Sequence, residues 1–188
     1  EAGNDKVLKA IKKGITLKQV RSAVSWSNEA GINNSVNFII GHKEEAYGDA
    51  LDTLRFADEL PTNFVNFYNL LPYPGTESLE WAKQHAVFLV PPDSFLENIS
   101  YRDNKPVFET KEFSRGQREE VIRRGFDLYR KKILQFRLGR VIGSFVYWVT
   151  KNSFINKFST NFALTNPLGR LIYLRLSKKS FMTKEGAA

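Results

Sequence analysis

Apolar residues in the first half of the chain fall into two patterns, one extended and one helical. Residues 36–40 and 64–70 are short apolar and aromatic runs with glycine or proline close behind, which is typical of buried strands. Segments with helical spacing precede, separate and follow these runs, over residues 5–13, 16–30, 47–60 and 76–84. The alternation of helix and strand predicts βα units and therefore a parallel sheet.

Local signals mark the ends of these helices. Thr16 and Gln19 have the spacing of a capping box, and Thr76 can cap the helix that follows it. Gly31 and Pro61 stand where the second and third helices should stop. The caps therefore agree with the apolar pattern.

A sheet of two parallel strands cannot close on itself. Unpaired N–H and C=O groups would remain at both of its edges. We therefore expect an α/β fold in which residues 1–86 form a partial (half) TIM-type barrel of parallel βα units. A mostly helical, basic C-terminal tail should follow.

The second half of the chain has a different pattern. Residues 87–113 are irregular, with a turn that favours a small hairpin around Asp103 and Asn104. Ser114 with Gln117 repeats the capping-box spacing and opens a long basic helix. This predicts three segments: a barrel segment over residues 1–86, a connector over 87–113 and a helical, aromatic-rich tail over 114–188.

The distribution of charge also separates the first part of the chain from its C-terminal tail. Residues 1–110 carry 11 Lys and Arg against 15 acidic residues, whereas residues 111–188 carry 17 against 5. The whole net charge of +8 thus comes from the tail. Such asymmetry indicates two regions with different surroundings.

The basic, aromatic tail has three readings. Its helices can cover the open side of the barrel, or residues 114–188 can lie on an anionic membrane surface. RNA binding by base stacking is the third, but no RNP-like or zinc-finger pattern favours a nucleic-acid partner. No apolar run reaches the ~18–20 residues of a spanning helix. With no targeting segment visible, we expect a cytoplasmic protein, membrane-associated if the second reading holds.

Candidate chemistry is limited by composition. The chain has no cysteine, which excludes disulfides, thiolate nucleophiles and cysteine ligands to an iron–sulfur cluster. His42 and His85 are its two histidines and read as a loop and a surface-helix residue. No phosphate-binding loop or GxGxxG motif occurs. We predict no catalytic and no metal-binding residue within this chain.

Binding residues are expected where parallel strands end, because α/β folds collect ligands there. After the first strand comes Gly41, which lets a ligand approach the backbone, and then Glu44, which can organise the loop. After the second strand comes a turn fixed by Pro72 and Pro74.

Four stretches resemble, in order, motifs of the radical S-adenosylmethionine (SAM) superfamily. Residues 1–14 resemble E-S-G-S followed by V-L-K-x-I-x-K-G, and residues 16–32 resemble the helix and turn after it. Residues 37–44 are similar to G-x-I-x-G-x-x-E, and residues 69–77 to P-Y-P-G-T-E. The most similar branch is the cobalamin-binding one, which includes anaerobic porphyrin-ester cyclases.

The resemblance implies a SAM pocket. Glu1 and Asn4 would lie near the ribose or the amino-acid moiety. Ile39 and Gly41 would lie against the adenine, with Glu44 supporting their loop. The sequence departs from the motif at its first glycine, which is Asn37, and at the usual Pro-Gly-Glu-Thr loop, which is replaced by residues 42–46.

Backbone groups around Leu71 and Pro72 would border the same pocket. In the superfamily, a cysteine-bound [4Fe–4S] cluster reduces SAM to a 5′-deoxyadenosyl radical. The cluster ligands and any cobalamin domain would lie outside this chain, in a missing N-terminal half of the same polypeptide. We therefore expect a C-terminal fragment of an iron–sulfur oxidoreductase or methyltransferase-like enzyme, inactive as it stands.

Two alternatives stay open. The chain can be a non-catalytic membrane-surface adaptor with a degenerate βα scaffold. It can also be a fragment of a tRNA-modifying methylthiotransferase, although those enzymes usually end in a β-barrel RNA module and this tail reads as helical.

Overall fold

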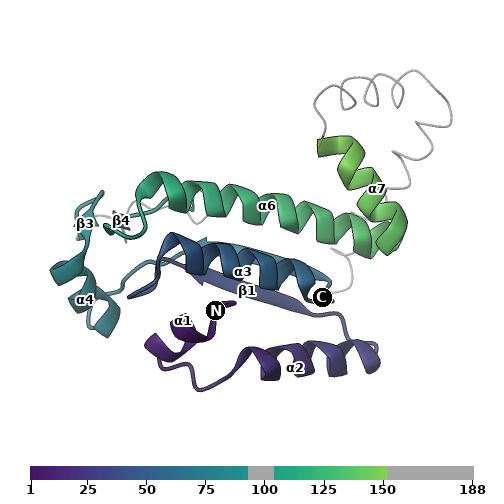
Figure 1. The fold of residues 1–188 in the computed structure, drawn as a ribbon, viewed down its shortest axis with the longest axis horizontal. Coiled ribbons are helices and arrows are strands. Elements are labelled where there is room, and N and C mark those ends of the chain that lie inside the picture. The colour runs from purple at the N-terminus through teal and green to yellow at the C-terminus, as the bar shows by residue number, and fades with distance from the viewer. Residues whose placement is uncertain (93–103, 152–188) are drawn as a thin grey trace, which may run out of the picture. The chain divides into compact units, whose positions relative to one another are not determined.

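The computed structural model describes residues 1–92 and 104–151 (Figure 1). Contacts divide the chain into two units, Glu1–Lys132 and Ile133–Ala188, which we describe separately. The predicted connector hairpin lies partly outside the described residues, as does the tail beyond Lys151. The three-segment division made from the sequence stays a prediction.

The centre of the first unit is a βαβ arrangement. Strand β1 (Ser35–Ile40) pairs in parallel with β2 (Phe64–Asn69), and helix α3 (Tyr47–Glu59) connects them. The register places Phe38 opposite Phe67. Both predicted strands and their parallel pairing are confirmed.

Three further helices lie around this centre. They are α1 (Asp5–Ala10), α2 (Leu17–Glu29) and α4 (Glu77–His85). The Thr16–Gln19 capping box is present at the start of α2, and the Thr76 hydroxyl accepts a hydrogen bond from Leu79 N–H at the start of α4. The caps predicted from the sequence are thus confirmed.

The connector and the long helix follow. Strand β3 (Val87–Phe88) pairs antiparallel with β4 (Phe108–Glu109), and α6 (Arg115–Leu138) begins after them. Gly139, at φ 83°, ends α6, and α7 (Arg140–Lys151) follows in the second unit. Among the described helices, none is long and apolar enough to cross a membrane.

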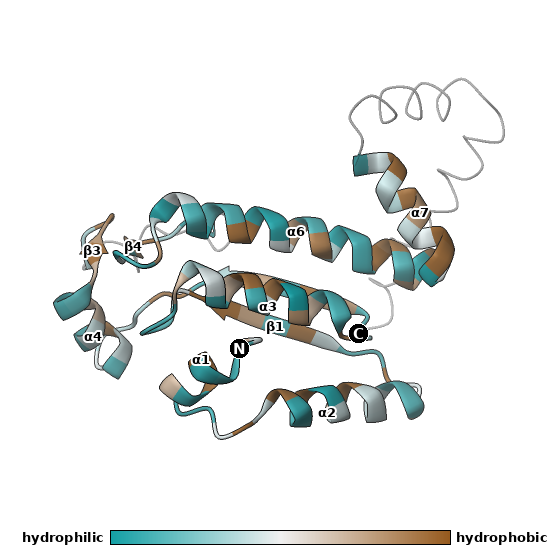
Figure 2. Cartoon of the chain, in the orientation of Figure 1, coloured by the Kyte–Doolittle hydropathy of each residue, from teal (hydrophilic) through white to brown (hydrophobic). Residues whose placement is uncertain are grey.

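One face of the β1–β2 sheet carries the core. Phe38 and Phe67 stack with ring centroids 5.0 Å apart, and Phe56 of α3 meets Phe38 edge-on at 6.4 Å. Val121 and Ile122 of α6 are buried in the same cluster. Figure 2 shows β1 as largely hydrophobic and α6 as largely hydrophilic, as expected for a helix that buries one side only.

The other face of the sheet is polar. Asn66 Nδ2 donates hydrogen bonds to Asn37 Oδ1 at 2.9 Å and to Ser35 Oγ at 3.2 Å. Parallel sheets usually bury both faces, so a face that carries hydrogen-bonded asparagine and serine side chains is unusual for a parallel sheet. The described residues form a mixed α/β fold with a two-stranded parallel sheet, and a half TIM-type barrel is not confirmed.

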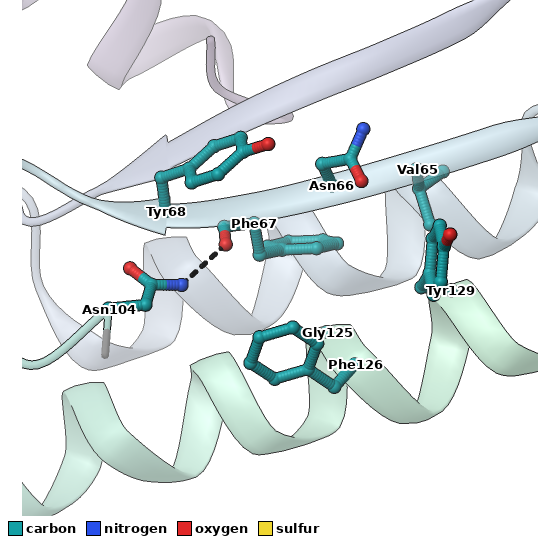
Figure 3. Close-up of a pocket in the computed structure, with 8 residues that line it drawn as sticks. All are labelled: Val65, Asn66, Phe67, Tyr68, Asn104, Gly125, Phe126 and Tyr129. Atoms are coloured by element: carbon teal, nitrogen blue, oxygen red, sulfur yellow. Dashed lines mark hydrogen bonds between the residues drawn. The ribbon is translucent and has the colours of Figure 1, made fainter. Parts of the chain in front are cut away.

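The two edges of the sheet are treated differently. On the β1 side, Ile39 N–H donates to the Glu1 carbonyl at 2.9 Å, so the first residues run beside the strand. On the β2 side, the Asn104 side chain accepts a hydrogen bond from Asn69 N–H at 2.8 Å. It also donates one to the Phe67 carbonyl at 2.8 Å (Figure 3). These are the two bonds that a neighbouring peptide group would make.

Helix α6 approaches β2 closely at one glycine. A Cβ on Gly125 would stand 2.6 Å from two ring carbons of Phe67 and 2.8 Å from its Cβ (Figure 3). Those atoms belong to the root of a side chain that is stacked and buried, so they cannot move aside easily. At Gly116, in the same helix, a Cβ would have nothing within 4 Å.

We predict opposite effects from the same substitution at these two sites. Gly125→Ala should lower the free energy of unfolding by about 1–3 kcal/mol, because overpacking outweighs the helix preference of alanine. Gly116→Ala should leave it unchanged or raise it by up to about 1 kcal/mol. Urea denaturation of the full chain measures both. Equal stability of the two variants would contradict the close packing of α6 on β2.

Candidate functional site

The loop after β1 is closed by a buried carboxylate. Gly41 has φ 93°, in the left-handed region, and its N–H donates to Glu45 Oε2 at 2.5 Å. The N–H of His42 donates to the same oxygen at 3.0 Å. Glu45 is 2% exposed. One carboxylate oxygen thus satisfies two N–H groups left over where the strand ends.

A buried guanidinium lies against the same glycine. Arg118 of α6 is 1% exposed, and a Cβ on Gly41 would overlap its Nη1. The guanidinium carbon lies 4.3 Å from the ring centroid of Phe108 and 5.0 Å from that of Phe113. Arg118 Nε also donates to the Phe113 carbonyl at 3.2 Å. The space that the missing side chain of Gly41 leaves is therefore filled by the protein itself.

Burial governs the protonation of the loop. It raises the pKa of the Glu45 carboxyl to about 7, against the two backbone N–H bonds and the positive charge of Arg118, which lower it. Burial also lowers the pKa of His42 to about 4, so the imidazole is neutral. For Arg118, burial lowers the pKa to about 10, and the guanidinium stays charged at neutral pH.

Glu1 lies close enough to act on this cluster electrostatically. Its carboxylate accepts a hydrogen bond from Lys13 Nζ at 2.7 Å, which, with the lysine charge, lowers the pKa of Glu1. The Glu1 charge in turn favours the protonated form of His42. Glu1, His42 and Arg118 thus form one electrostatic group at the carboxyl end of β1.

Several buried polar atoms at this end of the sheet have no hydrogen-bond partner. Within the described ranges they are Arg118 Nη1 and Nη2, Glu45 Oε1, His42 Nε2 and Asn69 Oδ1. Unpaired buried donors and acceptors are costly, and they concentrate where proteins bind ligands or water. The set offers both donors and acceptors, as recognition of a zwitterionic or hydroxylated molecule requires.

The structure brings some of the predicted site residues together. Glu1, Ile39 and Gly41 lie along one edge of β1, with Ile39 bonded to Glu1 through the backbone. Ile39 is half-buried and belongs to the polar face of the sheet. Leu71 is half-buried and Pro72 buried directly after β2.

Two other predicted residues have different surroundings. Asn4 caps α1, and its amide nitrogen donates to Asp49 at 3.2 Å and to Asp52 at 3.1 Å, so its side chain is already engaged. Glu44 is exposed and has φ 61°. The loop-organising hydrogen bonds come from Glu45 rather than from Glu44.

Sequence reasoning missed Glu45 and Arg118. Glu45 had a signal: in the usual Pro-Gly-Glu-Thr loop a glycine precedes the glutamate, and here Glu44 takes the left-handed conformation that suits glycine. Arg118 had none, because it lies on a helix far along the chain. The carboxyl group that accepts the loop N–H bonds thus lies one residue after the Glu44 to which the resemblance assigned that role.

The raised pKa of Glu45 predicts a pH-dependent stability. The folded chain holds a proton on Glu45 up to about pH 7 and the unfolded chain releases it near 4.5, so this group's contribution falls as pH rises between those values. His42 acts in the opposite direction between about pH 4 and 6.5. The Glu45 contribution is therefore measured as a difference from the Glu45→Gln variant, which cannot ionise.

The free energy of unfolding of Glu45→Gln should rise relative to the wild type, by at most about 3 kcal/mol from about pH 5 to about pH 8. Thermal or urea denaturation across that range checks it. Glu29→Gln, at the exposed end of α2, is the matched control and should follow the wild-type profile. Parallel profiles for all three chains would show that Glu45 ionises normally in the folded state.

Comparison with known proteins identifies a partial relative. No protein-family model and no solved structure matches the chain. A protein named as an uncharacterized methyltransferase, from Pyrococcus horikoshii, is 29% identical over 126 residues, which is 67% of this chain. The match spans 26% of that relative's length. The chain is thus similar to a portion of a longer protein that bears the name of a methyltransferase.

Proposed function

We propose that this chain forms part of a SAM-dependent, methyltransferase-like enzyme of the radical SAM type, and that SAM binds at the carboxyl end of β1. The observation that carries the proposal is the Gly41 loop, closed by the buried Glu45 carboxylate and flanked by Glu1. The methyltransferase name of the relative supports the use of SAM.

The residues present fit the parts of SAM. The Glu1 carboxylate is partly exposed and can accept hydrogen bonds from the ribose hydroxyls or the ammonium group. Ile39 offers a half-buried apolar side chain for the adenine plane. The Arg118 Nη1 and Nη2 atoms have no hydrogen-bond partner, so the positive guanidinium would favour a negatively charged group, such as a carboxylate, in this region.

The chain's own residues would bind and orient the cofactor. Glu45 accepts a hydrogen bond from Gly41 N–H, and Arg118 lies against the same glycine. The neutral His42 would add no further positive charge to a site for the SAM sulfonium. In the superfamily that the chain resembles, SAM reduced by a [4Fe–4S] cluster supplies a 5′-deoxyadenosyl radical. Because this chain has no cysteine, the cluster, and cobalamin where it is used, would be held by another part of the polypeptide.

The two-stranded sheet supports a site that this chain shares with another part of the polypeptide. The residues of β1 that direct their backbone groups away from β2 are Ser35, Asn37 and Ile39, and among these Ile39 N–H is bonded to Glu1. A parallel strand beside β1 would extend the sheet and bring further residues to the same carboxyl edge. The relative, about four times longer than the matched region, has room for such strands.

The test uses the full-length protein that contains this chain, reconstituted with iron and sulfide under anaerobic conditions. We expect it to bind SAM and, with dithionite, to release 5′-deoxyadenosine or a methylated product detectable by mass spectrometry. Glu1→Gln should weaken SAM binding by about tenfold or more, because a charged hydrogen bond to the ligand is lost.

Glu29→Gln, an exposed glutamate on α2, is the matched control and should bind SAM as the wild type does. A wild-type protein that binds no SAM would overturn the proposal. Equal affinity of the Glu1→Gln and Glu29→Gln variants would remove Glu1 from the site. SAM binding with methyl transfer but without deoxyadenosine would remove the radical chemistry and keep the methyltransferase.

A further inference from the structure

Helix α7 of the second unit exposes a continuous apolar surface. Val141 is 84% exposed, Ile142 59%, Phe145 63% and Trp148 57%. Spacings of three and four residues put Val141, Phe145 and Trp148 on one side of the helix. The rings of Phe145 and Trp148 stack with centroids 6.3 Å apart. We call these four side chains the α7 apolar face.

The opposite side of α7 is fixed to the end of α6 within the same unit. A Cβ on Gly143 would stand 2.5 Å from the backbone of Gln135, so the helices touch at this glycine. Gln135 Nε2 also donates to Ser144 Oγ at 2.9 Å. Helix α7 is thus held by a small and a polar residue, Gly143 and Ser144, while the four side chains of its apolar face stay exposed.

The charge of the second unit is strongly one-sided. Residues 133–188 contain nine Lys and Arg and a single acidic residue, Glu185, so they carry a net +8. Residues 1–132 contain 19 of each kind and are neutral. Helix α7 itself has Arg140 and Lys151 at its ends and no acidic residue.

We propose that the α7 apolar face inserts into the headgroup region of an anionic lipid bilayer, while Arg140 and Lys151, at the two ends of α7, meet the lipid phosphates. An amphipathic helix with bulky aromatic residues on one side and cations at its borders has this behaviour. Basic residues near an anionic surface contribute roughly 1 kcal/mol each. At twelve residues, α7 lies on the surface rather than crossing it.

Charge also argues against the other occupants of this face. A second copy docked there would bring together two units of net charge +8, which repel each other. RNA could stack on Phe145 and Trp148, but the exposed aliphatic side chains of Val141 and Ile142 would gain nothing from it, because they offer neither hydrogen bonds nor rings. An anionic lipid surface satisfies the apolar and the cationic requirement together.

The test is flotation of the full chain with vesicles. We expect binding to vesicles of phosphatidylcholine with about one third phosphatidylglycerol at low salt, and little binding to pure phosphatidylcholine. Phe145→Glu should reduce the partition coefficient by about tenfold or more, because a charge replaces an inserted ring. Phe126→Glu is the matched control: Phe126 is an exposed aromatic residue of α6 in the neutral unit, and its variant should bind as the wild type does.

Insertion has its own spectroscopic readout. Brominated lipids should quench Trp148 fluorescence, and Trp148→Phe should remove that quenching although Trp26 and Trp81 remain. Binding of Phe145→Glu equal to that of Phe126→Glu would overturn the proposal, as would quenching that persists in Trp148→Phe. So would a chain that ignores vesicles but binds oligouridylate, or one that forms dimers that Phe145→Glu dissociates.

Discussion

The contact between Arg118 and Gly41 is the constraint on which the candidate site depends. A guanidinium buried between Phe108 and Phe113 fills the volume that any side chain at Gly41 would need. Burying that charge requires compensation, and the aromatic faces and the nearby Glu45 carboxylate supply it in part. Helix α6 is thereby fastened to the carboxyl end of β1, where the loop must keep its shape.

Glu45 holds the same loop through hydrogen bonds from the loop's backbone N–H groups. Glu45 Oε2 accepts hydrogen bonds from two N–H groups of the loop. The preceding residue, Glu44, has a left-handed backbone conformation. Local strain of this kind persists only where the surroundings fix the backbone. A loop carboxyl group and a helix guanidinium therefore enclose one glycine. The buried atoms on them that have no hydrogen-bond partner lie at a strand end, where α/β folds bind ligands.

Much of the scaffold could be predicted from the sequence because it is encoded locally. The apolar run 36–40 and the Thr16–Gln19 capping box specify β1 and α2 through neighbours a few residues away. The site could be predicted only in part. Gly41 was identified, but the reason for it is Arg118, a partner on a distant helix that no spacing rule connects to it. Asn4 was assigned to a ligand, yet its amide is used by α1 and α3.

The two edges of the sheet differ in how easily another strand could pair with them. On the β2 side, the Asn104 side chain occupies the bonding positions of Phe67 and Asn69. A strand added there would have to displace these groups, which is how proteins block an edge. On the β1 side, within residues 1–92 and 104–151, the neighbour is the backbone of Glu1, whose carbonyl accepts from Ile39 N–H. The proposed extension of the sheet therefore fits the β1 side better than the β2 side, because a parallel strand there would bring its carboxyl end to the edge where Gly41 and Glu45 lie.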